Sequence, residues 1–189
     1  MRIRLRERYT PEQLAAVYPA PRRYDRESGG AAMNDCQADH FLRVQATIAL
    51  AAWMHDGGPV ADLSCGDGQI ARALTATPIL GDLAAGYAIQ GSIEETIHQL
   101  GPVELFICSE TLEHLDNPDA VLVEIRKRAR KLIVSTPYGE DTPVNPEHYW
   151  GWDKDGVGEM LAAAGFTPTA YMSLAVLRYP VFYQLWGLT

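Results

Sequence analysis

Short apolar, strand-like segments alternate with helical segments from residue 59 onward, and this alternation constrains the fold more than any other feature. Strands are predicted over residues 59–64, 79–80, 87–90, 103–108 and 131–135, with helices over 69–75, 94–100 and 118–130. Strands joined through helices pair in parallel and bury both faces of their sheet. The sequence therefore predicts an α/β, doubly wound fold with a mostly parallel sheet and helices on both faces.

The two ends of the chain differ from this pattern. Residues 10–19 predict a short helix and 21–34 a loop, so residues 1–34 are interpreted as a lead-in segment, a possible substrate lid, before a main domain over 35–189. A long amphipathic helix is expected over 35–55. After a helix over 154–164, two β-rich runs over 167–177 and 180–186 are separated by a tight turn, which requires a C-terminal antiparallel strand pair.

One connection is unusually short. Only residues 83–86 join the second and third predicted strands, which is too few for a crossover helix. Either this edge of the sheet lacks its helix, or the strand over 87–90 is misplaced.

Composition limits the function classes. The net charge of −8 in 189 residues argues against a large nucleic-acid interface. No apolar run of about 18 residues and no signal-like N-terminus occurs, so we expect a soluble, cytoplasmic protein with no membrane contact. The three cysteines lack metal-site spacing, which fits a reducing compartment. Seven arginines crowd the first 26 positions; they either meet an anionic substrate or partner, or form a solvated arm that touches nothing.

A glycine-containing turn follows the first predicted strand. Gly66 and Gly68 fit the loose pattern G-x-G-x-x-A, in which glycines let a ligand approach the backbone. Dinucleotide-binding folds share this pattern. The carboxylates of Asp62 and Asp67 would repel a pyrophosphate and attract a cation, which favours the sulfonium and ammonium of S-adenosylmethionine. Alternatively, Asp62 simply caps the turn.

Two segments carry a resemblance to a known family. Residues 60–68, VADLSCGDG, resemble motif I of the class I S-adenosylmethionine-dependent methyltransferases, with Ser64 at the first glycine position. Residues 103–115, VELFICSETLEHL, are similar to the fourth-strand segment of small-molecule members of that family. With the fifth strand and the closing strand pair, the likeness covers about residues 50–189. It implies a Rossmann-like methyltransferase domain that uses S-adenosylmethionine.

The resemblance also implies cofactor contacts at the strand ends. The residues concerned are Asp62, Ser64, Gly66, Gly68, Asp82, Ser92, Ile93, Cys108 and Ser109. Asp82 matches the acidic position that binds both ribose hydroxyls, although a turn residue after Gly81 is the alternative. Ser92 and Ile93 match the adenine side, where a serine makes a weaker bond than the aspartate of many relatives.

Methyl transfer depends mainly on positioning the acceptor and removing its proton. The candidate catalytic residues are Glu110, His114 and His148. The alternatives are a local capping role for His114 and a structural hydrogen bond for His148. The aromatic residues at 149, 150 and 152 either wall an apolar pocket or belong to the core. No His, Asp and Glu cluster has metal spacing, so no metal is expected.

The acidic charge, together with the absence of the D/N-P-P-Y/F/W and Pro-Cys segments of nucleic-acid methyltransferases, favours a small-molecule acceptor, with O- or N-methylation favoured over C-methylation. Two alternatives remain open. An inactive methyltransferase-like module that binds S-adenosylmethionine or a protein is suggested by Ser64, Ser92 and the short connection. A NAD-dependent oxidoreductase rests on the glycine pattern alone.

Overall fold

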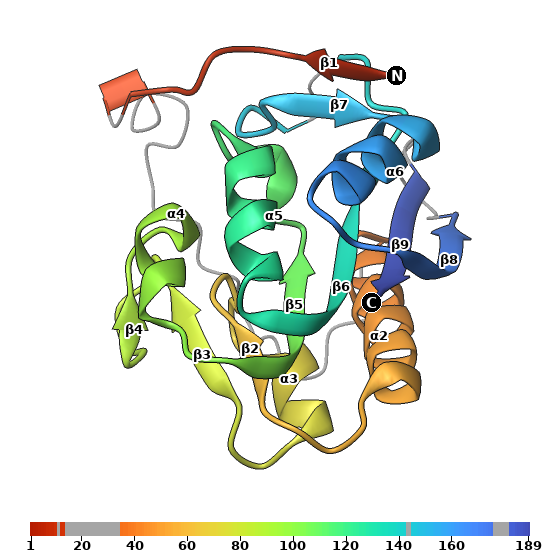
Figure 1. The fold of residues 1–189 in the computed structure, drawn as a ribbon. Helices are drawn as coiled ribbons and strands as arrows, with labels where there is room; N and C mark the ends of the chain where they lie inside the picture. The colour runs from red at the N-terminus through yellow and green to blue at the C-terminus, as the bar shows by residue number, and fades with distance from the viewer. Residues whose placement is uncertain (11, 14–34, 143–144, 176–181) are drawn as a thin grey trace.

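A seven-stranded sheet organises the computed structural model, which describes residues 1–10, 12–13, 35–142, 145–175 and 182–189 (Figure 1). The strand order is β4-β3-β2-β5-β6-β9-β8. The strands are β2 (Val60–Asp62), β3 (Ile79–Asp82), β4 (Ile89–Gln90), β5 (Val103–Ser109), β6 (Ala129–Tyr138), β8 (Pro168–Leu174) and β9 (Phe182–Leu188).

Pairing in the sheet is mixed. Strands β4, β3, β2, β5 and β6 are parallel, whereas β9 is antiparallel to both β6 and β8. This confirms the predicted Rossmann-like, mostly parallel sheet and its C-terminal antiparallel pair. Of the predicted lead-in helix over 10–19, the structure describes residues 10, 12 and 13: residues 12 and 13 are helical, and Thr10 Oγ1 accepts the Gln13 N–H at 3.3 Å. The loop over 21–34 and the turn before β9 lie outside the described residues.

Helices cover both faces of the sheet, as predicted (Figure 1). The helices are α2 (Asp35–Met54), α3 (Gln69–Leu74), α4 (Ile93–Thr96), α5 (Pro118–Arg126) and α6 (Lys154–Ala163). Successive residues of β5 face opposite sides: Phe106 packs in the core under α4, α5 and α6, and Ile107 in the core under α2 and α3. A strand buried on both faces has the continuous apolar sequence seen here.

Strand boundaries differ from the prediction by a few residues, and two helical segments differ in kind or length. The helix predicted over 118–130 ends at Arg126, because Ala129 already pairs with Val103 in the β5–β6 ladder. The segment predicted as a helix over 94–100 is α4 followed by one 3-10 turn, Ile97–Gln99. None of the described helices is both long and apolar enough to cross a membrane.

The short connection lies at the β4 edge of the sheet. Residues 83–88 join β3 to β4 without a helix, and the two strands pair in parallel, with Gly81 opposite Ile89. A Cβ at Gly81 would lie 2.9 Å from the Ile89 carbonyl oxygen, so glycine permits this close approach. The strand predicted over 87–90 therefore exists, over residues 89–90 only, and this edge lacks the crossover helix.

The N-terminus forms an element that the sequence analysis missed. Strand β1 (Arg2–Arg4) pairs antiparallel with β7 (Trp150–Trp152), in a two-stranded sheet beside the main one (Figure 1). Alternation in such short strands is too brief to be distinguished from a loop.

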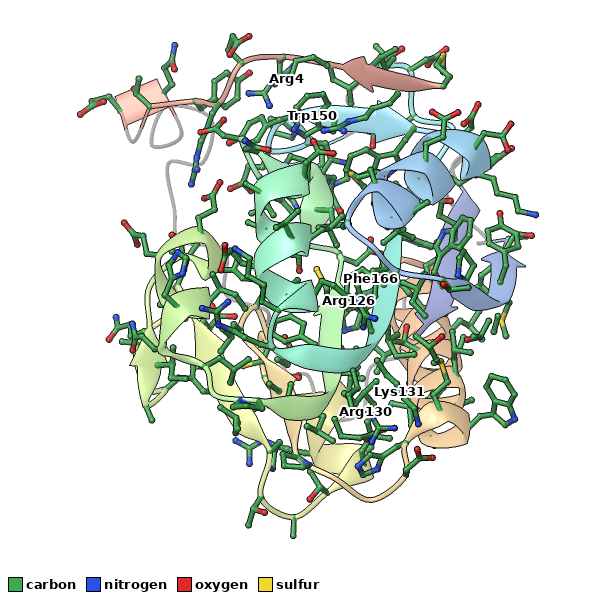
Figure 2. The ribbon with its side chains drawn as sticks, in the orientation of Figure 1. Arg4, Arg126, Arg130, Lys131, Trp150 and Phe166 are labelled. Atoms are coloured by element: carbon green, nitrogen blue, oxygen red, sulfur yellow. The ribbon has the colours of Figure 1, made fainter. Side chains whose placement is uncertain are left out.

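Charge pairing holds β1 in place. Arg2 makes two hydrogen bonds to Asp119, and Arg4 bonds to Asp116. Both guanidinium groups stack on the Trp150 ring, at 4.4 and 4.7 Å from its centroid (Figure 2 labels Arg4 and Trp150). For these arginines, the hypothesis of a solvated arm that touches nothing is wrong, because acidic residues of the main domain neutralise them.

Candidate cofactor and acceptor site

The predicted site residues end or follow the parallel strands: most lie at β2, β3 and β5, Ser92 and Ile93 follow β4, and His148 follows β6. The carboxyl ends of parallel strands meet at one edge of a sheet, and this is where open α/β folds bind their ligands. A shallow surface hollow lies at the opposite edge, lined by residues such as Gly58, Val103 and Ala129 that precede or begin strands. Its position excludes it from the predicted site.

The glycine turn is hydrogen-bonded to the Asp82 carboxylate. Gly66 and Gly68 have φ angles of 55° and 74°, a region that favours glycine. The Gly66 N–H donates to Asp82 Oδ2 at 2.8 Å, and Asp82 Oδ1 accepts from the Ala84 N–H at 2.9 Å. Each carboxylate oxygen has a second lone pair for a ligand hydroxyl. A Cβ on Gly66 would meet nothing within 4 Å, so there is open space above the turn.

Asp62 is a buried acid beside this turn. It ends β2 with 3% exposure, and its Oδ1 accepts the Ser64 N–H at 3.1 Å. Burial raises the pKa of Asp62 to about 7, and the nearby charge of Asp82 adds to the increase. A cation next to Asp62 would restore the charged form.

Ser64 has a partner that the sequence did not reveal. Its hydroxyl is hydrogen-bonded to the Thr111 hydroxyl at 2.7 Å, and Thr111 Oγ1 donates to the Ser109 carbonyl oxygen at 3.1 Å. The departure from the glycine pattern therefore ties the turn to the segment after β5.

The side chains of the residues predicted to contact adenine, and of Cys108, make contacts that stabilise the fold. Ser92 caps α4, and its Oγ accepts the Glu95 N–H while the Glu95 carboxylate accepts the Ser92 N–H. The Ile93 and Cys108 side chains are 4% and 0% exposed and pack in the core. Burial raises the pKa of the Cys108 thiol, so it stays protonated.

Glu110 and Ser109 lie at the end of β5. Glu110 has a φ angle of 53°, and its N–H donates to the Ser135 carbonyl oxygen, while Ser135 Oγ donates to Glu110 Oε1 at 2.9 Å. Arg43, from α2, donates to Ser109 Oγ at 2.8 Å. Burial raises the pKa of Glu110, and the positive charge of Arg43 opposes the increase. The left-handed backbone at a non-glycine residue marks a position held by its surroundings.

Glu113 lies one turn further on, fully buried. Thr136 Oγ1 donates to Glu113 Oε2 at 3.0 Å, and Trp152 Nε1 donates to Thr136 Oγ1 at 2.9 Å. Burial, together with the charge of Glu110, raises the pKa of Glu113 to about 8. Thr136 and the fixed position of Glu113 were not apparent from the sequence.

The two histidines lie against each other, with ring centroids 4.9 Å apart. His114 Nδ1 is 2.9 Å from the Glu147 carbonyl oxygen, and His148 Nδ1 is 2.7 Å from Glu140 Oε2. Burial alone would lower the pKa of His148, but the hydrogen bond to Glu140 and the charge of Glu113 raise it. Both histidines therefore make structural hydrogen bonds, and they also share one cluster.

The aromatic residues at 149, 150 and 152 pack within the fold. Tyr149 and Trp152 are 3% and 1% exposed, and Trp150 lies under the N-terminal arginines. Their packing supports the core alternative over an apolar pocket wall.

Comparisons with solved structures agree with this architecture. A 1,6-didemethyltoxoflavin N1-methyltransferase from Burkholderia thailandensis, with its substrate and S-adenosylhomocysteine bound, is 17% identical, with a TM-score of 0.65 over 82% of this chain and 80% of its own. The magnesium protoporphyrin IX methyltransferase from Synechocystis, with S-adenosylhomocysteine bound, is 16% identical, with a TM-score of 0.61 over 85% and 89%. Mitomycin 7-O-methyltransferase is 14% identical, with a TM-score of 0.54 over 81% and 56%.

No protein-family model matches the chain, and no curated protein matches it by sequence. The structural likeness shows the fold: the chain has the fold of the class I S-adenosylmethionine-dependent methyltransferases.

Proposed function

We propose that this protein is an S-adenosylmethionine-dependent methyltransferase that acts on a small molecule. The observation that carries the proposal is the buried Asp62 beside the open glycine turn, at the ligand-binding edge of the sheet. A cationic ligand stabilises the charged form of a buried acid, whereas a pyrophosphate gains nothing from the neutral form and is repelled by the charged one. The bound S-adenosylhomocysteine of the structural neighbours supports the same cofactor.

The cofactor, when bound, supplies a methyl group on a positively charged sulfur. Asp62 would lie by its methionine end, Gly66 and Gly68 would leave room for it, and Asp82 would bind the ribose hydroxyls. Ser64 and Ser109 are joined through Thr111, between the turn and the end of β5. Ile93 and Cys108 are buried in the core, so we propose that they take part in binding through backbone groups. The Ser92 hydroxyl accepts the Glu95 N–H and can still donate its own proton to a ligand.

The acceptor would enter above the end of β5. Glu110, His114 and His148 lie there with acidic and basic groups side by side, which suits removal of a proton from an oxygen or nitrogen nucleophile. Two neighbours, which methylate a toxoflavin precursor and magnesium protoporphyrin IX, act on small molecules. We therefore propose O- or N-methylation of a small-molecule acceptor.

Calorimetric titration with S-adenosylmethionine tests the cofactor site. The Asp82→Ala substitution removes a charged hydrogen-bonding group and is expected to weaken binding by about 1–3 kcal/mol, roughly 5- to 150-fold. Asp155→Ala, an exposed acid in the first turn of α6, is the matched control and should bind as the wild type does. Equal affinities for both variants would remove Asp82 from the site.

The alternatives are separated by two further experiments. A titration with NAD should show no binding; saturable NAD binding without S-adenosylmethionine binding would favour an oxidoreductase. A screen of small-molecule acceptors with methyl-labelled cofactor should find transfer to at least one compound. Cofactor binding with no transfer across a broad screen would instead favour the non-enzymatic binding module.

A further inference from the structure

A cluster of three possible metal ligands lies beside the acceptor side of the site. Among the described residues, Glu113, His114 and His148 each offer a ligand atom, and these atoms all lie within 4.8 Å of one another. Glu113 and His114 belong to the 3-10 turn Leu112–His114 after β5, and His148 precedes β7. Because His148 is 34 positions away in sequence, spacing alone did not predict the cluster.

One carboxylate oxygen in the cluster is buried without a partner. The Glu113 side chain is 1% exposed; Thr136 bonds to Oε2, and Oε1 has no hydrogen bond. The atom near Oε1 is His114 Nε2, at 3.9 Å. A buried carboxylate oxygen left unsatisfied is costly, so the site is arranged for a positive ligand at this point.

Hydrogen bonds set the orientation of both imidazoles. The Glu147 carbonyl oxygen only accepts, so His114 Nδ1 carries the proton and Nε2 carries the lone pair. His148 Nδ1 donates to the Glu140 carboxylate in the same way, which leaves the lone pair on the other nitrogen. A histidine whose Nδ1 is held by a carbonyl or carboxylate, with Nε2 directed at an ion, is the usual arrangement around protein-bound metals.

We propose that Glu113 Oε1, His114 Nε2 and His148 Nε2 bind one divalent transition-metal ion of the Zn²⁺, Co²⁺ and Mn²⁺ class. Two imidazoles with one carboxylate favour these ions over Mg²⁺ and Ca²⁺, which prefer oxygen ligands. Ligand atoms around a tetrahedral ion at about 2.1 Å lie about 3.4 Å apart, so shifts of up to roughly 0.8 Å in each ligand atom would close the site. The sequence-based expectation of no metal is revised accordingly.

Three protein ligands leave coordination positions open. The cluster adjoins Glu110 at the end of β5, where the acceptor is proposed to enter, so an oxygen or nitrogen of the acceptor would complete the coordination and lose its proton more readily. This role rests on the proposed methyl transfer. Metal binding itself does not, because it needs only the three side chains.

Metal titration of tag-free, chelator-treated protein tests the proposal without cofactor or acceptor. Co²⁺ should bind with a stoichiometry of one per chain and give visible absorption bands, and Zn²⁺ should displace it. His114→Ala, His148→Ala and Glu113→Gln should each weaken Co²⁺ binding by at least about tenfold. Glu140→Gln keeps every ligand but weakens the hold on His148, so a loss of about 10- to 100-fold is expected. His98→Ala, at an exposed histidine, is the matched control and should leave binding unchanged.

The absence of stoichiometric Co²⁺ binding to the folded wild type would overturn the proposal. Unchanged binding in the His148→Ala variant would do the same, as would an equal loss in the His98→Ala control. Circular dichroism of each variant separates unfolding from ligand loss, and Glu140→Gln supplies the test if a ligand variant does not fold. Calorimetry with S-adenosylmethionine on the same samples tests cofactor binding separately, so a failure of the proposed function is distinguished from a failure of metal binding.

Discussion

Two buried carboxyl groups, of Asp62 and Glu113, and one half-buried carboxyl group, of Glu110, lie at the ligand-binding edge of the sheet. Asp62, Glu110 and Glu113 each have a pKa raised by burial, and each is fixed by at least one hydrogen bond from a backbone or hydroxyl group. Buried acids with raised pKa values are typical of functional sites, where a ligand or ion compensates for the cost of burying them.

Asp62 makes the stability of the ligand-free protein depend on pH. Its folded-state pKa of about 7 lies above the ordinary value of 3.8, so between these two values the folded chain keeps a proton that the unfolded chain has lost. The free energy of unfolding should therefore fall as pH rises through this window, by up to about 1.4 kcal/mol per pH unit from this group. Asp62→Asn should reduce the slope of the free energy of unfolding against pH, measured by denaturant titrations at pH 5, 6 and 7.

Asp155→Asn changes an exposed acid and should keep the wild-type slope. Identical slopes for wild type, Asp62→Asn and Asp155→Asn would show that Asp62 is charged and solvated in the folded protein, which would contradict the site described above.

At the scale of the elements, the N-terminal strand packs beside the site. Strand β1 pairs with β7, and the Met1 amino group contacts Asp153, the N-cap of α6. Strand β7 contains Trp152, which bonds to Thr136 and through it to Glu113. Hydrogen bonding therefore connects the docked N-terminus to the acceptor side of the site.

Substitution of two glycines in α6 distinguishes the contact of the N-terminal strand with this helix from the effect of helix propensity. Alanine favours a helix over glycine by about 1 kcal/mol, so propensity alone predicts that Gly156→Ala and Gly158→Ala both stabilise the protein. A Cβ at Gly156 would overlap the Met1 carbonyl oxygen, whereas one at Gly158 would meet only Trp186 at 3.4 Å. We expect thermal unfolding to show a lower Tm for Gly156→Ala and an equal or higher Tm for Gly158→Ala.

Removal of residues 1 and 2 from the Gly156→Ala variant should relieve the overlap between the new Cβ and the Met1 carbonyl oxygen. The Tm difference from Gly158→Ala should then become smaller. If Gly156→Ala were as stable as Gly158→Ala in the full-length chain, the N-terminal strand would not be docked against α6.

Across the whole molecule, periodic segments were the part of the fold that could be predicted. The alternation from residue 59 indicated the parallel sheet, and the short 83–86 connection offered an edge without a helix as one of two alternatives, which the β3–β4 pairing decides. Short strands such as β1 have too few residues for a period, and their pairing depends on distant partners such as Asp119 and Trp150. The same holds in the site: strand ends were predictable, but the contacts Ser64–Thr111 and His148–Glu140 form only in three dimensions.

A crystal structure of the complex with S-adenosylhomocysteine would test the central proposal most directly. We predict that its ribose hydroxyls lie within hydrogen-bond distance of Asp82 and that its amino group lies beside Asp62, above the open space at Gly66. The ligand bound at another edge of the sheet, or a nicotinamide dinucleotide taken up on the glycine turn in its place, would contradict the proposed cofactor site.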